Sequence, residues 1–313
     1  MNYVVVSAAR NEETFIRLTA DSLVAQTKRP LRWIVVDDGS TDRTAAIVRE
    51  YASREPWIEL ISLPARNGRD FSRKVRAVNL GLNRVADLDF EVLVNLDADV
   101  SFEPAYMEFL IEKFVADPAL GVCGTPFTEE GGYDSTRDSF EGEEYVAGPC
   151  QLFRRRCFRD IGGYVPNPSG GVDWIAVMTA RMRGWKVQAF GDKRFHHHRP
   201  MGTAGRTRIA AQFSYGQKDY YLGGSPIWQL FRAAYRMTKP PLLAGGMALL
   251  LGYGWAAVRR IRRPVTPELM HFHRQDQFRK LRRITRTLAR LQRPERFRSV
   301  PGAATHSEGQ VRS

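Results

Sequence analysis

Cysteine is scarce in this chain, and its few cysteines are not spaced as metal ligands. The 313 residues include only Cys123, Cys150 and Cys157, too few for a disulfide framework. They also lack the paired C-x2-C spacing of a structural zinc site. A reduced, cytoplasmic setting fits this composition best.

Several other sequence signals are missing. The chain begins Met1-Asn2-Tyr3 and continues directly into a strand-like run. No charged-then-apolar leader precedes that run, so we expect that the protein is not exported. Neither G-x-x-x-x-G-K-[ST] nor a G-x-G-x-x-G turn after the first strand occurs. These absences disfavour P-loop NTPases and dinucleotide-binding folds.

Acidic residues are too few to balance the basic ones, and the excess lies at one end. The chain holds 47 Lys and Arg against 34 Asp and Glu, a net charge of +13. The segment 255–313 alone has 15 basic and four acidic side chains, whereas residues 1–254 have 32 and 30. The basic tail therefore suits an anionic partner, either a membrane leaflet or nucleic acid. Because no nucleic-acid recognition motif accompanies the charge, we favour the membrane and expect no nucleic acid.

Strand-like and helical patterns alternate through the first third of the chain. Strands are predicted at 3–7, 31–36, 58–63 and 90–96, and helices at 11–25, 43–52, 72–85 and 104–115. This alternation predicts parallel βαβ units in a doubly wound α/β sheet. Ligands bind beyond the carboxyl ends of strands in such sheets. Three polar clusters follow predicted strands: Arg10-Asn11-Glu12, Asp37-Asp38 and Asp97-Ala98-Asp99.

Five motifs in this order resemble the family 2 glycosyltransferases, which have a GT-A nucleotide-diphospho-sugar transferase fold. The resemblance spans roughly Tyr3 to Arg199. The motifs are the opening strand and base-binding turn at 4–13, Asp37-Asp38-Gly39-Ser40-Thr41-Asp42, a K-x-x-A-x-N-x-G segment at 74–81, the D-x-D motif Asp97-Ala98-Asp99, and Gly171-Val172-Asp173-Trp174. The last matches the family only at its Asp.

The resemblance implies a set of contacts to a nucleotide-sugar donor. The residues implied are Ala8, Arg10, Glu12, Asp38, Lys74 and Asp97. Asp38 would hydrogen-bond the base, and Arg10 would stack on it where many relatives have an aromatic residue. Glu12 and Lys74 would contact ribose and phosphate. On their own, Asp38 also fits a turn acid, and the other side chains fit a solvated surface.

A metal site is implied beside these contacts. Asp97 and Asp99 are two residues apart, so both side chains lie on one side of an extended strand and suit Mg²⁺ or Mn²⁺. The resemblance assigns Asp99 to the metal, Asp97 to ribose or metal, and adds His197 or His198. In an extended run His197 points away from both neighbours, so His196, His197 and His198 cannot all serve one site. A solvated acid pair and a chance histidine cluster are the alternatives.

Asp173 is the implied catalytic base. In the resembling family this Asp deprotonates the acceptor hydroxyl, and attack opposite the departing diphosphate inverts the anomeric carbon. Here Val172 replaces the Glu that usually precedes it. The alternative role is a helix cap after Gly170-Gly171. The Q-x-x-R-W motif of processive synthases is absent, which favours single-addition transfer.

The C-terminal third predicts a membrane-associating extension. Pro240 to Val258 has no charge and would extend about 28 Å as a helix, close to a bilayer core. Its glycines weaken a helix, and a span would place the basic tail outside against the positive-inside rule. We therefore expect a shallow or re-entrant element. A basic amphipathic helix should follow, or else a helix packed on the catalytic domain. Its apolar positions are Phe278, Leu281, Ile284, Leu288 and Leu291.

Together these features predict four segments. They are a nucleotide-sugar-binding half at 1–120, an acceptor-binding half at 121–235, a membrane-associating helical extension at 236–298 and a disordered tail at 299–313. The expected activity is inverting, metal-dependent glycosyl transfer from a nucleotide-diphosphate donor to a hydroxyl acceptor. The expected acceptor is a lipid-linked glycan for bacterial envelope polysaccharide or exopolysaccharide. The expected location is the cytoplasmic face of the bacterial inner membrane. A non-catalytic nucleotide-sugar-binding scaffold and a sugar nucleotidyltransferase are the alternatives.

Overall fold

The computed structural model describes residues 1–65, 71–130, 132–138, 142–167, 170–199 and 207–289. Its strands are β1 Tyr3–Ala9, β2 Arg32–Asp37, β3 Ile58–Ser62, β4 Val92–Leu96, β5 Val100–Ser101, β6 Leu120–Gly124, β7 Phe127–Glu129, β8 Cys150–Arg154, β9 Lys186–Ala189 and β10 Phe195–His197. Its helices are α1 Ile16–Val24, α2 Thr44–Arg54, α3 Phe71–Arg84, α4 Tyr106–Ala116, α5 Ser135–Asp138, α6 Arg155–Asp160, α7 Val172–Met182, α8 Arg208–Tyr221, α9 Pro226–Met237, α10 Ala244–Val258 and α11 Pro267–Ala289.

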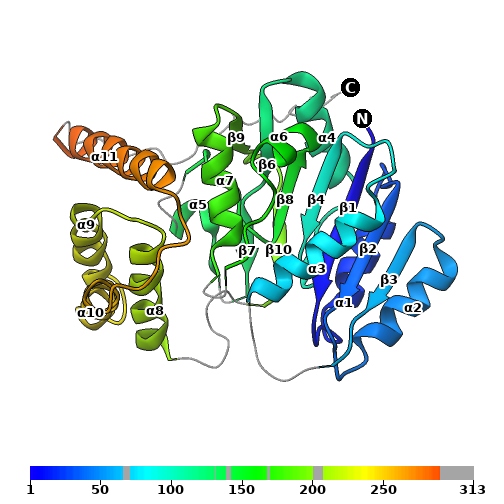
Figure 1. Ribbon diagram of the computed structural model, residues 1–313, viewed down its shortest axis with the longest axis horizontal. Helices are drawn as coiled ribbons and strands as arrows, with labels where there is room; N and C mark the ends of the chain where they lie inside the picture. Colours follow the sequence, from blue (N-terminus) through cyan, green and yellow to red (C-terminus); the bar gives the residue numbers. More distant parts are fainter. Residues whose placement is uncertain (66–70, 131, 139–141, 168–169, 200–206, 290–313) are drawn as a thin grey trace, which may run out of the picture.

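A seven-stranded sheet forms the centre of the fold (Figure 1). The strand order is β3-β2-β1-β4-β8-β6-β9. All pairings are parallel except those of β8, which runs antiparallel to β4 and β6. The predicted α/β class and mostly parallel sheet are therefore confirmed, although the pattern did not predict β6 or β8.

The sheet is buried on both faces because its strands are apolar at successive positions. In β1, Tyr3 and Val5 join one hydrophobic cluster with α1, α2 and α4, and Val4 and Val6 join another with α3, α6 and α7. On the second face, α3 packs closely on β1. A Cβ at Gly81 of α3 would lie 2.5 Å from Val6 Cγ1. The glycine of the K-x-x-A-x-N-x-G segment thus has a packing role.

The first helix begins later than predicted. The pattern placed it from residue 11, but α1 begins at Ile16. Asn11 has a φ of 54°, which is incompatible with a right-handed helix. Its side chain instead accepts a hydrogen bond from the backbone N–H of Thr41 at 2.9 Å. The residues after β1 are therefore held as a loop against the loop after β2.

A second, three-stranded sheet in the order β5-β10-β7 lies beside the carboxyl end of β4. β10 pairs antiparallel with β5 and parallel with β7. The consecutive histidines lie in and just after β10. This small sheet matters for function because it places Asp99, just before β5, next to the histidines.

The four C-terminal helices lie to one side of the main sheet (Figure 1). α8 and α10 pack with backbones almost touching: a Cβ at Gly252 would lie 2.0 Å from the Phe213 carbonyl oxygen. α9 also packs on α10, through Gly246. The predicted boundary at residue 235 falls inside α9 (226–237), so α8 to α10 form one unit that starts near residue 207.

α11 packs on α7 over its first half. Leu269 and Phe272 contact an apolar cluster with Trp174 of α7. Arg181 of α7 donates to Asp276 of α11 at 2.8 Å. Among the alternatives for this helix, packing on the catalytic domain holds for these residues. Leu291 and the predicted tail at 299–313 lie outside the described residues.

No helix in the described part of the chain combines the length and apolarity that a membrane span requires. α10, which has no charged residue, has 15 residues, whereas a span needs about 20.

Candidate active site

The predicted site residues gather beyond the carboxyl ends of β1, β2 and β4. Two loops there are tied together: the Asn11 backbone N–H donates to Ser40 Oγ at 2.9 Å, and the Glu12 N–H donates to Thr44 Oγ1 at 2.7 Å. The sequence folds this way because short polar side chains after β2 satisfy backbone groups after β1. These hydrogen bonds therefore hold the two loops together at this edge of the sheet.

Lys74 and Asp97 form an ion pair at the centre of the site. Lys74 Nζ lies 2.5 Å from Asp97 Oδ1. Burial alone would lower the pKa of Lys74, but the charges of Asp97, Asp173 and Asp99 raise it overall. The ammonium group therefore stays protonated and feels the charge of three nearby carboxylates.

Asp99 and His197 face each other from β5 and β10. His197 Nε2 lies 3.5 Å from Asp99 Oδ1, and His197 Nδ1 lies 3.0 Å from Glu129 Oε1. Burial would lower the pKa of His197, but these two carboxylates raise it to about 9. All three side chains are buried. A protonated imidazole therefore balances two acids that solvent hardly reaches.

Glu12 approaches the same group of acids from the loop after β1. Arg199 donates to Glu12 Oε2 at 2.5 Å, and Arg199 Nε lies 3.8 Å from Asp99 Oδ2. Burial and the charges of Asp99 and Asp97 raise the pKa of Glu12 to about 8, although Arg199 opposes the shift. The carboxyl groups thus crowd one another despite their basic partners.

These acids fit a hard divalent cation. Asp99 Oδ1 is buried and receives no hydrogen bond from the described residues; its nearest partner is His197 Nε2 at 3.5 Å. A buried oxygen held only by this longer ion pair can gain from a closer ligand. Mg²⁺ and Mn²⁺ prefer carboxylate oxygens, and a cation would also relieve the repulsion that raises the pKa of Glu12. Asp97 and Asp99 are the residues that would hold the ion, and His197 could join them only by giving up its Nε2 proton.

Asp173 lies in the first turn of α7, close to the Lys74 ammonium. The helix cap is Gly171 rather than Asp173, and no side chain caps the helix. A Cβ at Gly148 would lie 2.6 Å from Asp173 Oδ2, so the missing side chain at Gly148 makes room for this carboxylate. Within the described residues, no hydrogen bond to the Asp173 carboxylate is found, which leaves its oxygens for a ligand.

The base-binding residues of the resemblance lie farther along the same edge. Asp38 follows β2, and its backbone N–H donates to the Ala9 carbonyl oxygen at 2.9 Å. Its Oδ1 lies 3.6 Å from the Arg73 guanidinium. Ala8 pairs with Val36 in the β1–β2 ladder, and Arg10 lies in the loop just beyond β1. Asp38 follows β2 and Asp97 follows β4, and both strands belong to the seven-stranded sheet.

The three histidines divide between two faces of β10. His197 faces Asp99, as described above. His198 turns the other way, with its Nε2 2.9 Å from Ser101 Oγ, and its ring stacks on Phe15 with centroids 5.7 Å apart. Partial burial and the neighbouring His196 lower the pKa of His198. Of the two histidines predicted at the metal, the structure thus places His197 beside Asp99 and His198 on the opposite face.

Sequence reasoning missed four residues of this site. Arg73, Glu129, Gly148 and Arg199 contact the predicted residues, as the distances above show. Arg199 could have been found, because it directly follows the histidines at a strand end. Glu129 and Gly148 carry no local signal, since they come close to their partners only through the small sheet and the loop before β8.

The fold and this edge of acids define the class: an α/β protein of GT-A-like fold with a carboxylate-rich site at the ends of its parallel strands. The family model described as glycosyl transferase family 2 matches residues 4–166, which is more than half of the chain. The protein therefore belongs to glycosyl transferase family 2, as the motifs predicted.

Individual relatives match over 120 residues of the chain. The chain is 30% identical over 120 residues to the glycosyltransferase GlyA of Streptococcus pneumoniae serotype 4 (strain ATCC BAA-334 / TIGR4), which is 37% of this chain and 16% of that protein. It is 28% identical over 120 residues to the poly-beta-1,6-N-acetyl-D-glucosamine synthase of Staphylococcus epidermidis, 38% of this chain and 27% of that protein. The chain thus matches less than a third of the length of these relatives.

Solved structures share the fold over nearly the whole chain. The mannosyltransferase PcManGT from Pyrobaculum calidifontis, in complex with GDP-Man and Mn2+, superposes with a TM-score of 0.54 at 19% identity, covering 93% of this chain and 80% of that one. TarS 1-349 of S. aureus, in complex with UDP-GlcNAc, gives 0.53 at 15% identity and covers 93% of both chains. At these identities the likeness establishes the fold.

Proposed function

We propose that this protein is an inverting glycosyltransferase that moves a sugar from a nucleotide-diphosphate donor to a hydroxyl acceptor. One observation carries the proposal: Asp97, Asp99, Lys74 and Asp173 converge at the sheet edge, with an unsatisfied buried oxygen on Asp99. Such an edge can hold a diphosphate and place a base beside it. Nucleotide-sugar complexes of proteins with this fold support a donor of this class.

The proposal takes the role of each side chain from the family resemblance. Asp38 and Arg10 orient the base at the far end of the edge, and Lys74 binds the diphosphate. Asp173, whose oxygens have no hydrogen-bonding partner among the described residues, takes the proton from the acceptor hydroxyl as that oxygen attacks the anomeric carbon. Bound Mn²⁺ or Mg²⁺ would neutralise charge on the leaving nucleoside diphosphate.

The acceptor side of the proposal rests on the C-terminal helices. We infer that α9 and α10 lie against the cytoplasmic face of a bacterial inner membrane, where a lipid-linked glycan would reach the site. The exposed residues of α10 are all apolar or glycine, and the exposed residues of α9 are apolar as well. The large ones are Met247, Leu251, Trp255, Val258, Ile227 and Leu230.

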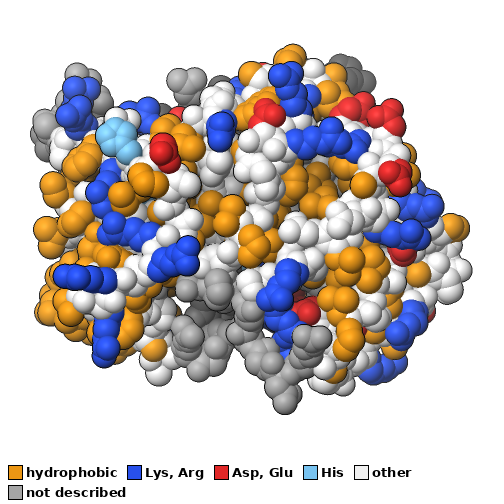
Figure 2. Space-filling model, viewed as in Figure 1, with side chains coloured by type: hydrophobic (Ala, Val, Ile, Leu, Met, Phe, Trp, Pro, Cys, Tyr) orange, Lys and Arg blue, Asp and Glu red, His pale blue; other side chains and the backbone are white. Residues whose placement is uncertain are grey.

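Basic residues border this apolar face at both ends. Arg236 and Lys239 precede α10, and Arg259, Arg260 and Arg262 follow it. Figure 2 shows hydrophobic side chains gathered with Lys and Arg at its lower left, where α9 and α10 lie. Apolar area flanked by cations is what an anionic lipid surface binds. This face supports peripheral attachment more directly than α11 does, because α11 is partly occupied by its packing on α7.

Donor binding and turnover test the catalytic proposal. Thermal unfolding would be followed with UDP, GDP, dTDP and CDP, each with and without Mn²⁺. A nucleotide at a hundredfold excess over its Kd stabilises the folded state by about 2.7 kcal/mol. We expect one nucleotide to stabilise the protein in a metal-dependent way, and Asp99→Ala to abolish that effect.

The corresponding nucleotide-sugar is then used to measure turnover as nucleoside diphosphate release. Asp173→Asn should keep donor binding and lose release by roughly a hundredfold or more, as expected for loss of a general base. Full activity in Asp173→Asn would refute its role as the base. Donor binding without any turnover in the unmodified protein would instead favour a binding scaffold, and pyrophosphate release from a nucleoside triphosphate would favour a nucleotidyltransferase.

A further inference from the structure

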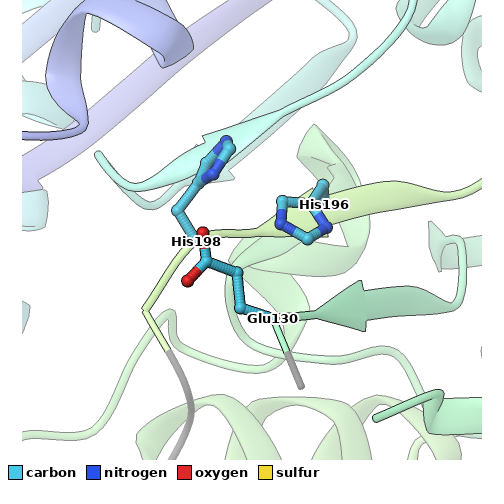
Figure 3. A group of neighbouring side chains, drawn as sticks. All are labelled: Glu130, His196 and His198. Carbon is cyan, nitrogen blue, oxygen red and sulfur yellow. The ribbon is translucent and has the colours of Figure 1, made fainter. Parts of the chain in front are cut away.

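A second cluster of metal-ligating side chains lies on the face of β10 opposite Asp99. Glu130, His196 and His198 each offer a ligand atom, and these atoms all lie within 4.8 Å of one another. Figure 3 shows these three side chains close together around the end of β10. We propose that these three residues bind a late first-row divalent metal ion, best Zn²⁺, at a site separate from the donor-site cation.

Hydroxyl groups orient both imidazoles for this role. Thr128 Oγ1 lies 3.1 Å from His196 Nδ1, and Ser101 Oγ lies 2.9 Å from His198 Nε2. Each ring therefore has one nitrogen fixed by a neighbouring strand and the other nitrogen left for a ligand. Metal-binding histidines in proteins are held in the same manner, with the second nitrogen hydrogen-bonded to an oxygen.

The ligand set favours zinc over the cation expected at the donor site. Two imidazoles and one carboxylate suit Zn²⁺, which binds three such ligands plus water in a tetrahedron. Tetrahedral ligand atoms lie about 3.4 Å apart at these bond lengths, so the side chains need to close by roughly an ångström. Asp97 and Asp99 supply oxygen ligands, which Mg²⁺ and Mn²⁺ prefer. The two sites should therefore differ in which ion they select.

An ion at this position would stabilise the small sheet. Glu130 directly follows β7, and the two histidines belong to β10 or follow it. The ion would therefore join β7 to β10, the strand that also carries His197 toward Asp99. The inferred role is structural: it fixes the geometry of the neighbouring site without contacting the donor, and it does not depend on the proposed transfer reaction.

Zinc binding in the absence of nucleotide tests this inference. Full-length protein freed of metal by chelator would be titrated with Zn²⁺ in competition with a chromophoric chelator. We expect one tightly bound ion per chain, and a weakening of about tenfold to a hundredfold or more in His196→Ala and in Glu130→Gln. Thr128→Val removes only the hydroxyl that orients His196 and should weaken binding by about tenfold or more. Bound Co²⁺ gives a visible spectrum that reports the same ligands.

Two matched variants separate this site from other sources of binding. His271→Gln removes an exposed histidine from α11, and Asp99→Asn alters the donor-site acids; both should keep the tight zinc ion. Glu130 is exposed, so Glu130→Gln should fold normally even if the histidine variants do not. The inference is overturned if the unmodified protein binds no zinc tightly, if Glu130→Gln binds it unchanged, or if only Asp99→Asn loses it.

Discussion

At the scale of single residues, the sharpest feature is the contact between Gly148 and Asp173. An added methyl group at Gly148 would lie 2.6 Å from Asp173 Oδ2, closer than van der Waals contact allows. Gly148→Ala should therefore displace the proposed base and lower kcat by roughly a hundredfold, since ångström displacements have effects of this size, while nucleotide binding persists.

The control for this substitution is Gly254→Ala in α10, where an added methyl group meets no atom within 4 Å. We expect Gly254→Ala to leave turnover unchanged and to stabilise the helix by about 1 kcal/mol. Steady-state kinetics on both variants checks the prediction. Equal kcat values for Gly148→Ala and the parent would mean that Asp173 has room to move without loss of function.

His197 gives a prediction about pH. Its pKa in the folded protein is about 9, raised from 6.5 by Asp99 and Glu129 against the effect of burial. The stabilisation from its protonated form is therefore fully present below pH 6.5 and is lost as pH rises through 9. The difference is about 3 kcal/mol in the metal-free protein.

Urea unfolding across this pH range, for the parent and for His197→Gln, measures the effect. Glu12 also makes the folded state less stable as pH rises through 8, because its pKa is raised from 4.5 to about 8. The informative quantity is therefore the difference between the two proteins. That difference should shrink toward high pH, and a constant difference would contradict the assigned pairing.

Residue positions in the site could be predicted only where motifs mark them. Asp97, Asp99, Lys74 and Asp173 carry the resemblance and are brought together by the fold. The assignment of His197 rather than His198 to the side of Asp99 required the side-chain contact itself, in which His197 Nε2 lies 3.5 Å from Asp99 Oδ1. Sequence showed that neighbouring histidines must face opposite ways, but not which face meets the acids.

At the scale of elements, the attachment of α11 to α7 depends on one buried acid. Asp276 is paired with Arg181, Arg279 and Lys280. Burial would raise the pKa of Asp276, but Arg181 and Lys280 lower it below its ordinary value of 3.8. Asp276→Asn should reduce the free energy of unfolding by about 3 kcal/mol at neutral pH, because it leaves buried Arg181 with less compensation.

The sign of the pH effect distinguishes an ionic role from a packing role for Asp276. A depressed pKa means that the stabilisation is present above pH 3.8 and disappears as pH falls through the folded-state pKa. The difference in melting temperature between parent and Asp276→Asn should therefore diminish in acid. A difference that persists at the lowest pH would indicate that the amide disturbs packing.

The contact between α8 and α10 makes a separate prediction about overpacking. A Cβ at Gly252 would lie 2.0 Å from the Phe213 carbonyl oxygen, and one at Gly216 the same distance from the Leu249 carbonyl oxygen. Gly252→Ala should destabilise the helical unit by about 1–3 kcal/mol, although alanine favours helix formation. Thermal unfolding, with Gly254→Ala as the reference in the same helix, measures this cost.

Most elements of the catalytic part could be predicted, because strand-like and helical periods differ clearly there. The late start of α1 could not, since it depends on hydrogen bonds from Asn11 to the loop after β2. The sequence indicates correctly that the glycines of α10 lower helix propensity. In the folded chain they also allow α8 and α9 to approach, a tertiary effect that propensity does not describe.

At the scale of the whole molecule, the charge asymmetry and the exposed apolar face of α9 and α10 together predict binding to an anionic membrane. Burying one exposed leucine in lipid contributes about 1.5–3 kcal/mol, so Leu251→Glu should weaken vesicle binding by about tenfold or more. Val115 on α4 is exposed to the same degree as Leu251, at 60%, and lies outside the C-terminal unit. Val115→Glu therefore adds the same charge at a matched position and should leave binding unchanged.

Cosedimentation with vesicles that contain phosphatidylglycerol, compared with phosphatidylcholine alone, separates the apolar and electrostatic contributions. We expect the parent to bind the anionic vesicles, with binding that falls as salt rises because cations flank the apolar face. If Leu251→Glu and Val115→Glu bind equally well, the face of α9 and α10 is not the contact. Loss of binding on removal of the segment after 289 alone would then assign the contact to the basic C-terminal end, and the acceptor would have to reach the site from that side.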